Sequence, residues 1–342
     1  MLINAVRLAD ATPAFSRAAK MFEVGVPDDL VLPIKLTTTG CRKNWRRWLF
    51  AALAVVGTQS PLCSAQAGTI EEVIRAPVVL HTHLDGHRQE IRQDIVVTVF
   101  RDDQRQKSPY VVVNHGRLSS AADRAEFGRV RYSENSRYLV SLGFSVLVPT
   151  RIGYGVTGGP DVEFSGPCNK KDYAVGFDAA ADEVVAVLER AKTLPGVSLS
   201  HGIVVGASFG GMTAIKLTTM NLPGLAAGVN FSGGVGGDPK HRPGNPCSPN
   251  LLNQLYRHYG TAAKVPSLWL YSTNDQYWGE RLPHQWFQSF VDAGGMARFV
   301  QLPPYGDDGH KSFTDNPPAW KPAVEGFLRE FRFDEASKPG SQ

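Results

Sequence analysis

The sequence predicts an α/β protein with a mostly parallel, doubly wound sheet and an antiparallel edge on its N-terminal side. From residue 110 onward, short β-branched runs alternate with segments of helical periodicity, which is the order of βαβ units. Two alternating Val- and Ile-rich segments precede this region, with Asp85-Gly86 between them. The run from Gly202 to Ala214 indicates a buried strand, a sharp turn and a helix.

The first half of the chain supplies the edge and the first βαβ unit. Residues 71–84 and 90–100 alternate apolar and polar side chains, which predicts an antiparallel hairpin. Residues 110–113 and 144–148 are continuous apolar runs, as expected of buried parallel strands. Between them, residues 129–142 have helical spacing.

The second half continues the alternation. Apolar residues recur at helical spacing in four further segments, which predicts helices at 172–192, 251–259, 279–293 and 320–331. Short runs of apolar residues predict strands at 203–205, 225–231, 267–271 and 298–302. The connections 151–171 and 233–264 are longer than the fold requires and follow carboxyl ends of strands, where open α/β sheets bind ligands. We expect them to roof the site.

Charge distribution argues against nucleic acid as a partner. Of 342 residues, 36 are Lys or Arg and 32 are Asp or Glu, a net charge of +4. Residues 1–67 hold eight basic and four acidic residues, so the remainder balances at 28 of each. A phosphate backbone would need a basic stripe, which the balanced remainder lacks.

Residues 1–67 are expected to be a leader, followed by one catalytic domain at 68–337. Residues 42–47 form a positive region, 48–57 an apolar core and Ala65-Gln66-Ala67 a cleavage pattern, so 42–67 has the order of a signal peptide. The alternative is a buried helix. We expect a periplasmic or secreted protein, with no stable membrane insertion after cleavage. Residues 1–41 precede the signal, and translation starting near Leu36 would explain that extension.

Cys168 and Cys247 are the two cysteines of the expected mature chain. Each lies in one of the long connections, and two cysteines in an exported protein most economically form one disulfide. The alternative is two unrelated thiols. A bridge would tie the two roof segments together.

Gly206-Ala207-Ser208-Phe209-Gly210 matches the G-x-S-x-G nucleophile elbow. Five residues of this kind also arise by chance in glycine-rich turns. Here a strand precedes the motif and a helix follows it, which is the context that presents a serine hydroxyl above a sheet edge. Ser208 is therefore the expected nucleophile.

An acid and a base are expected after later strands. Asp275 follows the strand at 267–271, and His310 follows the strand at 298–302. Asp275 has the alternative role of a turn residue. The neighbours Asp307 and Asp308 are interpreted as turn residues of the histidine loop.

Two backbone amides are expected to form the oxyanion hole. One belongs to Phe209, directly after the nucleophile. The other belongs to Arg117, in the loop His115-Gly116-Arg117 after the strand at 110–113. The alternative for this loop is a simple glycine turn.

As an ordered set, these motifs resemble the α/β-hydrolase superfamily, and within it dienelactone hydrolase-like and prolyl-oligopeptidase-like serine hydrolases. The resemblance rests on residues 115–116, 151–155, 206–211, 274–275 and 308–310 and covers the chain from about 68 to 333. Dienelactone hydrolases use a cysteine nucleophile, so Ser208 departs from them and lactone hydrolysis does not follow.

Aromatic side chains near these loops suggest a substrate pocket, with the sheet core as the alternative location. The expected pocket residues are His115, Tyr154, Tyr277 and Trp278. Arginines at 117, 151 and 242 are candidates for binding an acidic substrate.

The sequence thus predicts a serine hydrolase that cleaves small carboxylic esters through an acyl-enzyme. Two alternatives stay open: a prolyl-oligopeptidase-like peptidase acting on short peptides, and a non-catalytic binding protein on the same fold. No metal-ligand spacing or phosphate loop is present in the sequence, so no cofactor or metal is expected. Oligomeric state and substrate identity stay open.

Overall fold

The computed structural model describes residues 68–84 and 87–331. The predicted leader, the Asp85-Gly86 turn and residues 332–342 lie outside the described residues. Within the described part, no helix combines the length and the apolar character needed to cross a bilayer.

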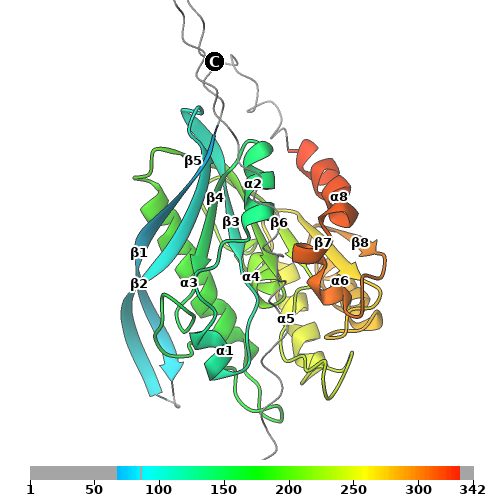
Figure 1. The fold of residues 1–342 in the computed structure, drawn as a ribbon. Helices are drawn as coiled ribbons and strands as arrows, with labels where there is room; N and C mark the ends of the chain where they lie inside the picture. The colour runs from blue at the N-terminus through cyan, green and yellow to red at the C-terminus, as the bar shows by residue number, and fades with distance from the viewer. Residues whose placement is uncertain (1–67, 85–86, 332–342) are drawn as a thin grey trace, which may run out of the picture. The chain divides into compact units, whose positions relative to one another are not determined.

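One sheet organises the described residues, and it has eight strands (Figure 1). The order across the sheet is β1-β2-β4-β3-β5-β6-β7-β8. Strand β2 runs antiparallel to β1 and β4, and the other neighbours are parallel, which confirms the predicted fold class. The strands are β1 Thr69–Leu84, β2 His87–Asp102, β3 Lys107–Asn114, β4 Ser145–Thr150, β5 Gly196–Ala207, β6 Leu225–Phe231, β7 Ser267–Ser272 and β8 Ala297–Leu302.

Helices alternate with the parallel strands. They are α1 Ala121–Ala125, α2 Ser133–Ser141, α3 Tyr173–Ala191, α4 Phe209–Leu217, α5 Pro249–Ala262, α6 Arg281–Asp292, α7 Ser312–Asp315 and α8 Pro317–Arg329, with a 3₁₀ turn, η1, at Gly309–Lys311. The helix expected from residue 129 begins only at Ser133. Val130 is instead tied to the sheet, since its N–H donates to Thr150 Oγ1 at 3.0 Å and its carbonyl accepts from Thr98 Oγ1 at 2.8 Å.

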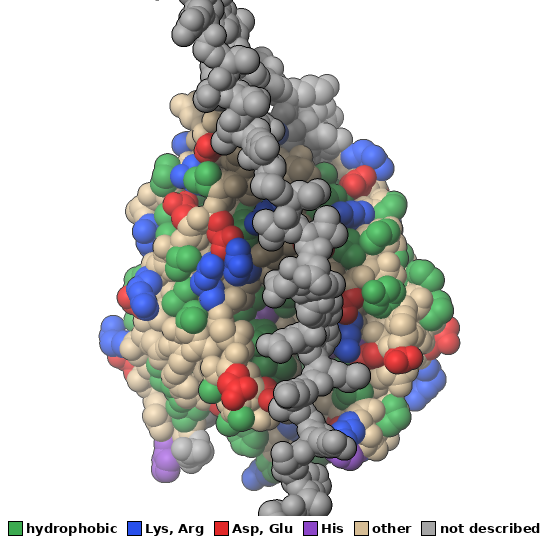
Figure 2. Space-filling view, viewed as in Figure 1, with side chains coloured by type: hydrophobic (Ala, Val, Ile, Leu, Met, Phe, Trp, Pro, Cys, Tyr) green, Lys and Arg blue, Asp and Glu red, His purple; other side chains and the backbone are tan. Residues whose placement is uncertain are grey.

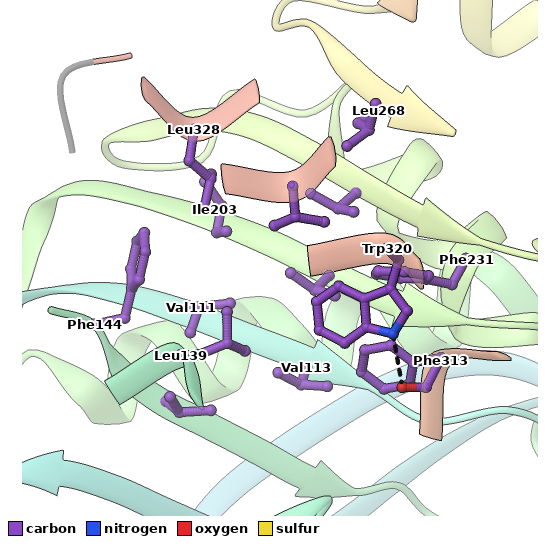
Figure 3. Packing of buried hydrophobic residues seen from close by; sticks show 14 of the residues in the cluster. Val111, Val113, Leu139, Phe144, Ile203, Phe231, Leu268, Phe313, Trp320 and Leu328 are labelled. Carbon is purple, nitrogen blue, oxygen red and sulfur yellow. Dashed lines mark hydrogen bonds between the residues drawn. The ribbon is translucent and has the colours of Figure 1, made fainter. Parts of the chain in front are cut away.

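The sheet is buried on both faces because its central strands carry apolar side chains toward both of them. Val111 and Val113 on β3 belong to the core cluster that contains residues of α2 and α8. Val112, between them, belongs to the cluster that contains residues of α3 and α4, as the alternation of side chains along a strand requires. Figure 3 shows the first cluster, where Trp320 Nε1 donates to the Phe313 carbonyl at 3.2 Å.

Acidic and basic side chains are interspersed on the surface shown in Figure 2. This distribution agrees with the balanced charge of residues 68–342. Four parallel strands, β3, β5, β7 and β8, carry the loops with the expected functional residues at their carboxyl ends. The site is therefore assembled at one edge of the sheet.

Candidate active site

Ser208 lies at the turn between β5 and α4. Its backbone angles, φ 56° and ψ −121°, are a combination that residues other than glycine rarely adopt. The flanking glycines make the turn possible, because a Cβ on Gly206 would overlap the carbonyl of Gly210, and one on Gly210 would overlap the carbonyl of Asn114. This is the geometry expected of a nucleophile elbow.

Asp275 and His310 are in direct contact. Nδ1 of His310 lies 2.9 Å from Oδ2 of Asp275. The other carboxylate oxygen, Oδ1, accepts the backbone N–H groups of Tyr277 at 2.8 Å and Trp278 at 3.1 Å. Asp275 is 2% exposed, so the acid is buried and hydrogen-bonded through both oxygens. It orients the imidazole so that Nε2 is the nitrogen left for chemistry.

Two aromatic rings fix the histidine from its sides. The ring of Tyr277 stacks on His310 with centroids 3.9 Å apart, and Trp278 meets it edge-on at 5.5 Å. Trp278 also contacts the segment that follows β6, because its Nε1 donates to the Ser232 carbonyl at 2.7 Å and its ring packs against Gly234. The imidazole is therefore held in one orientation by its acid and by its neighbours.

Ser208 and His310 are linked by contacts through Gly234 and Trp278, and no direct hydrogen bond joins them. The N–H of Gly234 donates to the Ser208 carbonyl at 3.1 Å, and Gly234 packs against Trp278, which contacts His310. Within the residues that the structure describes, the Ser208 hydroxyl has no hydrogen-bond partner. Catalytic hydrogen bonds are often long in enzymes without substrate and shorten when substrate binds.

Both expected oxyanion donors border Ser208. Phe209 is the first residue of α4, so its N–H has no acceptor within the helix. Gly116 packs against the nucleophile, since a Cβ built on it would lie 3.3 Å from Ser208 Cβ and 3.8 Å from Oγ. The adjacent amide of Arg117 makes no hydrogen bond with the described residues. Neither of the two expected donors therefore has its N–H bonded to a described residue.

The expected substrate pocket is largely wrong. His115, Tyr154 and Trp278 are at most 1% exposed, so they pack beneath the site and offer no surface to a substrate. The hydroxyl of Tyr154 donates to Glu163 Oε2 at 2.6 Å. Tyr277 is partly exposed, but its ring covers His310. Tyr277 and Trp278 contact His310, whereas His115 and Tyr154 pack against each other.

The arginines considered for an acidic substrate are already occupied. Arg117 binds both carboxylate oxygens of Asp161 at 2.7 Å, and Arg151 binds Glu163. Arg242 contacts the two sulfurs of the disulfide, at 3.2 and 3.1 Å. Arg117 and Arg151 are therefore not free to receive a substrate carboxylate, because each is paired with a carboxylate of this chain.

The predicted disulfide between Cys168 and Cys247 is present. It joins the two long connections over the sheet edge, and Ser248 Oγ adds a hydrogen bond to the Cys168 carbonyl at 3.2 Å. Asp161 and Glu163, in the first of these connections, were missed by the sequence reasoning. Their signal was present as two acidic residues two positions apart in a glycine-rich loop that begins with an arginine directly after a strand.

Among the described residues, the structure has no group of three or more potential metal-ligating side chains. The site that the structure assembles consists of a serine at a strained turn, a buried acid bonded to a histidine, and free backbone amides. Such a set can perform nucleophilic chemistry on a carbonyl group.

Comparison with known proteins supports the fold. A scan against protein-family models gave no match, and a search of curated proteins gave no significant match. Among solved structures, the chain is similar to an acylaminoacyl peptidase in complex with a chloromethyl ketone, with 13% identity and a TM-score of 0.51. It is similarly related to the acylaminoacyl peptidase of Pyrococcus horikoshii, with 13% identity and a TM-score of 0.50.

Each of these two alignments covers 78% of this chain and 42% of the peptidase. This chain therefore spans about two fifths of the length of either peptidase. The Pyrococcus furiosus esterase Pf2001 aligns over 75% of this chain and 90% of its own length, with 16% identity and a TM-score of 0.47. The strand order, the antiparallel edge and the similarity to the two peptidases show that the chain has the α/β-hydrolase fold.

Proposed function

We propose that the protein is a serine hydrolase that cleaves small carboxylic esters through an acyl-enzyme. Ser208 Oγ attacks the ester carbonyl carbon while His310 Nε2 takes the hydroxyl proton, and the amides of Phe209 and Arg117 bind the oxyanion. As the tetrahedral intermediate collapses, the C–O bond to the leaving group breaks and His310 returns the proton to the departing alcohol. Water then attacks the acyl-enzyme in the same way, releasing the acid and restoring Ser208.

The observation that carries the proposal is the combination of the Asp275–His310 hydrogen bond with Ser208 at a positive φ. Strained backbone of this kind clusters at active sites, and the ψ of −121° at Ser208 lies outside the left-handed region that Ser248 occupies. This argues against the non-catalytic alternative.

A peptidase is the second candidate. Two solved structures that match with a TM-score of 0.50 or more are acylaminoacyl peptidases. Within the described residues, however, only the β1–β2 hairpin precedes β3. Residues 69–102 form this hairpin alone, so that part of the chain supplies no domain that would select peptides by size, and we take small esters as the proposed substrates.

Two measurements test the function. A panel of p-nitrophenyl esters of graded chain length, assayed beside aminoacyl-nitroanilides, should give higher kcat/KM for the short esters. Ser208→Ala should abolish labelling by a fluorophosphonate and lower kcat by about 10⁴-fold or more. Ser248→Ala is the matched control, because Ser248 also has a positive φ directly before a helix. Hydrolysis by Ser208→Ala at the wild-type rate would exclude the proposal.

We also infer that the protein is exported. The Cys168–Cys247 disulfide supports this, because such bonds persist in oxidising compartments. The signal-like order of residues 42–67 supports it independently.

A further inference from the structure

Arg151 is a fully buried cation that no step of the proposed chemistry uses. It is 0% exposed at the end of β4. Its Nη1 donates to the His115 carbonyl at 2.8 Å and its Nη2 to the Gly116 carbonyl at 3.4 Å. Its guanidinium carbon lies 5.3 Å from the centroid of the Phe209 ring. One side chain thus contacts both segments that supply the expected oxyanion donors.

We propose that Arg151, held by Glu163, is a positioning residue that aims the Arg117 amide at the oxyanion. This inference rests on the proposed function and names a residue beyond its triad and its two backbone donors.

The peptide between Gly116 and Arg117 explains the effect. In a trans peptide the C=O and the N–H point in opposite directions, and the described chain has no cis peptide. The Gly116 carbonyl is directed toward the buried guanidinium of Arg151. The N–H of Arg117 must therefore point away from the buried side, and Gly116 itself packs against Ser208. Holding the carbonyl fixes the direction of the amide.

His115 completes this hold on the carbonyl. Burial lowers the pKa of His115 well below its ordinary value, and the charge of Arg151 adds to this, so the ring is neutral. Its Nε2 accepts the backbone N–H of Arg151 at 3.2 Å, which places the proton on Nδ1. Nδ1 lies 2.7 Å from the Gly116 carbonyl and donates to it. The carbonyl thus has two donors on its buried side.

Glu163 fixes the position of the Arg151 guanidinium. Its Oε1 accepts from Arg151 Nε at 2.5 Å, and both side chains are 0% exposed. Its Oε2 accepts from the Tyr154 hydroxyl and from Arg117 Nη1, at 2.6 and 3.3 Å. Arg117 is held a second time by Asp161. The donor residue is therefore fixed through its side chain as well as through its peptide.

Arginine is required for this geometry. A guanidinium can bind the carboxylate of Glu163 and two carbonyl groups at once, because its five donors lie in one rigid plane. Lysine would keep the positive charge beside Glu163 but has a single ammonium group. Arg151→Lys therefore retains the charge pair and removes the simultaneous hold on residues 115 and 116.

The first test compares Arg151→Lys with Arg101→Lys. Arg101 is the matched control, since its Nε also donates to a glutamate, Glu72 Oε1 at 3.0 Å, and its side chain is 16% exposed on β2. Arg151→Lys should lower kcat for the best p-nitrophenyl ester by about 100-fold and change KM by less than about threefold. Affinity for a trifluoromethyl ketone analogue, which carries an oxyanion when bound, should fall in parallel. Arg101→Lys should retain wild-type kcat.

The second test separates positioning from stability. Removing one partner of a buried ion pair is destabilising, whereas replacing both with apolar residues is often neutral. Arg151→Met combined with Glu163→Met should therefore regain part of the melting temperature that Arg151→Met loses, while kcat stays about 100-fold low. The recovery is partial because the Tyr154 hydroxyl and Arg117 Nη1 also lose Glu163 as their acceptor.

Recovery of kcat together with stability in the double variant would overturn the inference, and so would wild-type kcat in Arg151→Lys. Either result, with Ser208→Ala inactive, would leave the hydrolase proposal intact. Wild-type turnover by Ser208→Ala would instead remove the hydrolase proposal, and the inference with it.

Discussion

At the scale of single residues, the site depends on backbone atoms as much as on side chains. Gly116 leaves room for Ser208, and its carbonyl is bound from below by Arg151 and His115. A glycine in this place allows the loop to approach the nucleophile closely. Its substitution should therefore affect chemistry more than folding.

Gly116→Ala should lower kcat by about 10-fold or more with little change in melting temperature. The new Cβ would lie 3.3 Å from Ser208 Cβ, so the serine must move by a few tenths of an ångström. Gly210→Ala is the contrasting variant, because its Cβ would overlap the Asn114 carbonyl and destabilise the fold. Steady-state kinetics and thermal unfolding of both proteins check this, and unchanged kcat in Gly116→Ala would contradict the close approach.

At the scale of elements, α3 carries a buried carboxyl group into the layer beneath the site. Glu183 is 0% exposed, and its Oε2 accepts the Ile152 N–H at 2.9 Å. Burial raises the pKa of Glu183 from 4.5 to about 8, with the charge of Arg151 opposing the rise. The folded state therefore prefers the protonated acid.

Stability should consequently depend on pH through Glu183. Because the pKa is raised by folding, its favourable contribution is complete below about pH 4.5 and is lost as pH rises through about 8. Glu183→Gln keeps a neutral acceptor, so its melting temperature should exceed that of the wild type at pH 9 by several degrees and match it near pH 5. Glu189→Gln, an exposed change on the same helix, should show no such pH dependence. Parallel melting curves for Glu183→Gln and the wild type would refute the assignment.

The two roof connections are joined at the level of elements by the Cys168–Cys247 disulfide, whose cysteines are 79 residues apart in sequence. Replacing both cysteines with serine should lower the free energy of unfolding by about 2 to 4 kcal/mol. Since the disulfide ties together the two connections that flank the site, the KM of the double variant should rise under conditions in which its sheet is still folded. Denaturant titration and ester kinetics measure the two effects. Unchanged KM would show that the roof does not contact substrate.

At the scale of the whole molecule, export predicts a processed N-terminus. The mature chain should begin at or within a few residues of Gly68, after the Ala65-Gln66-Ala67 pattern. N-terminal sequencing of protein from an extracytoplasmic fraction checks this. An intact leader on active cytoplasmic protein would contradict the export proposal and leave the hydrolase proposal untouched.

The sequence by itself determined the order of the elements and the chemical types at the sheet edge. Periodicity located β6 and the β1–β2 hairpin, because strands buried on both faces and alternating edge strands have distinct patterns. The G-x-S-x-G motif between a strand and a helix predicted Ser208 as the candidate nucleophile. Position after a strand predicted Asp275 and His310 as the candidate acid and base, and these two side chains are in hydrogen-bond contact. These are local signals, and local geometry follows from local sequence.

Only the tertiary structure decided which buried polar side chains pair with one another. Arg151 and Glu163 are twelve residues apart in a loop of no fixed periodicity, and their pairing depends on how that loop folds back under Gly116. The burial of His115 and Trp278 was likewise invisible in sequence, because an aromatic residue in a loop can face solvent or core. Long-range packing, which no short pattern encodes, placed Tyr277 and Trp278 against the His310 ring and buried His115 against Tyr154.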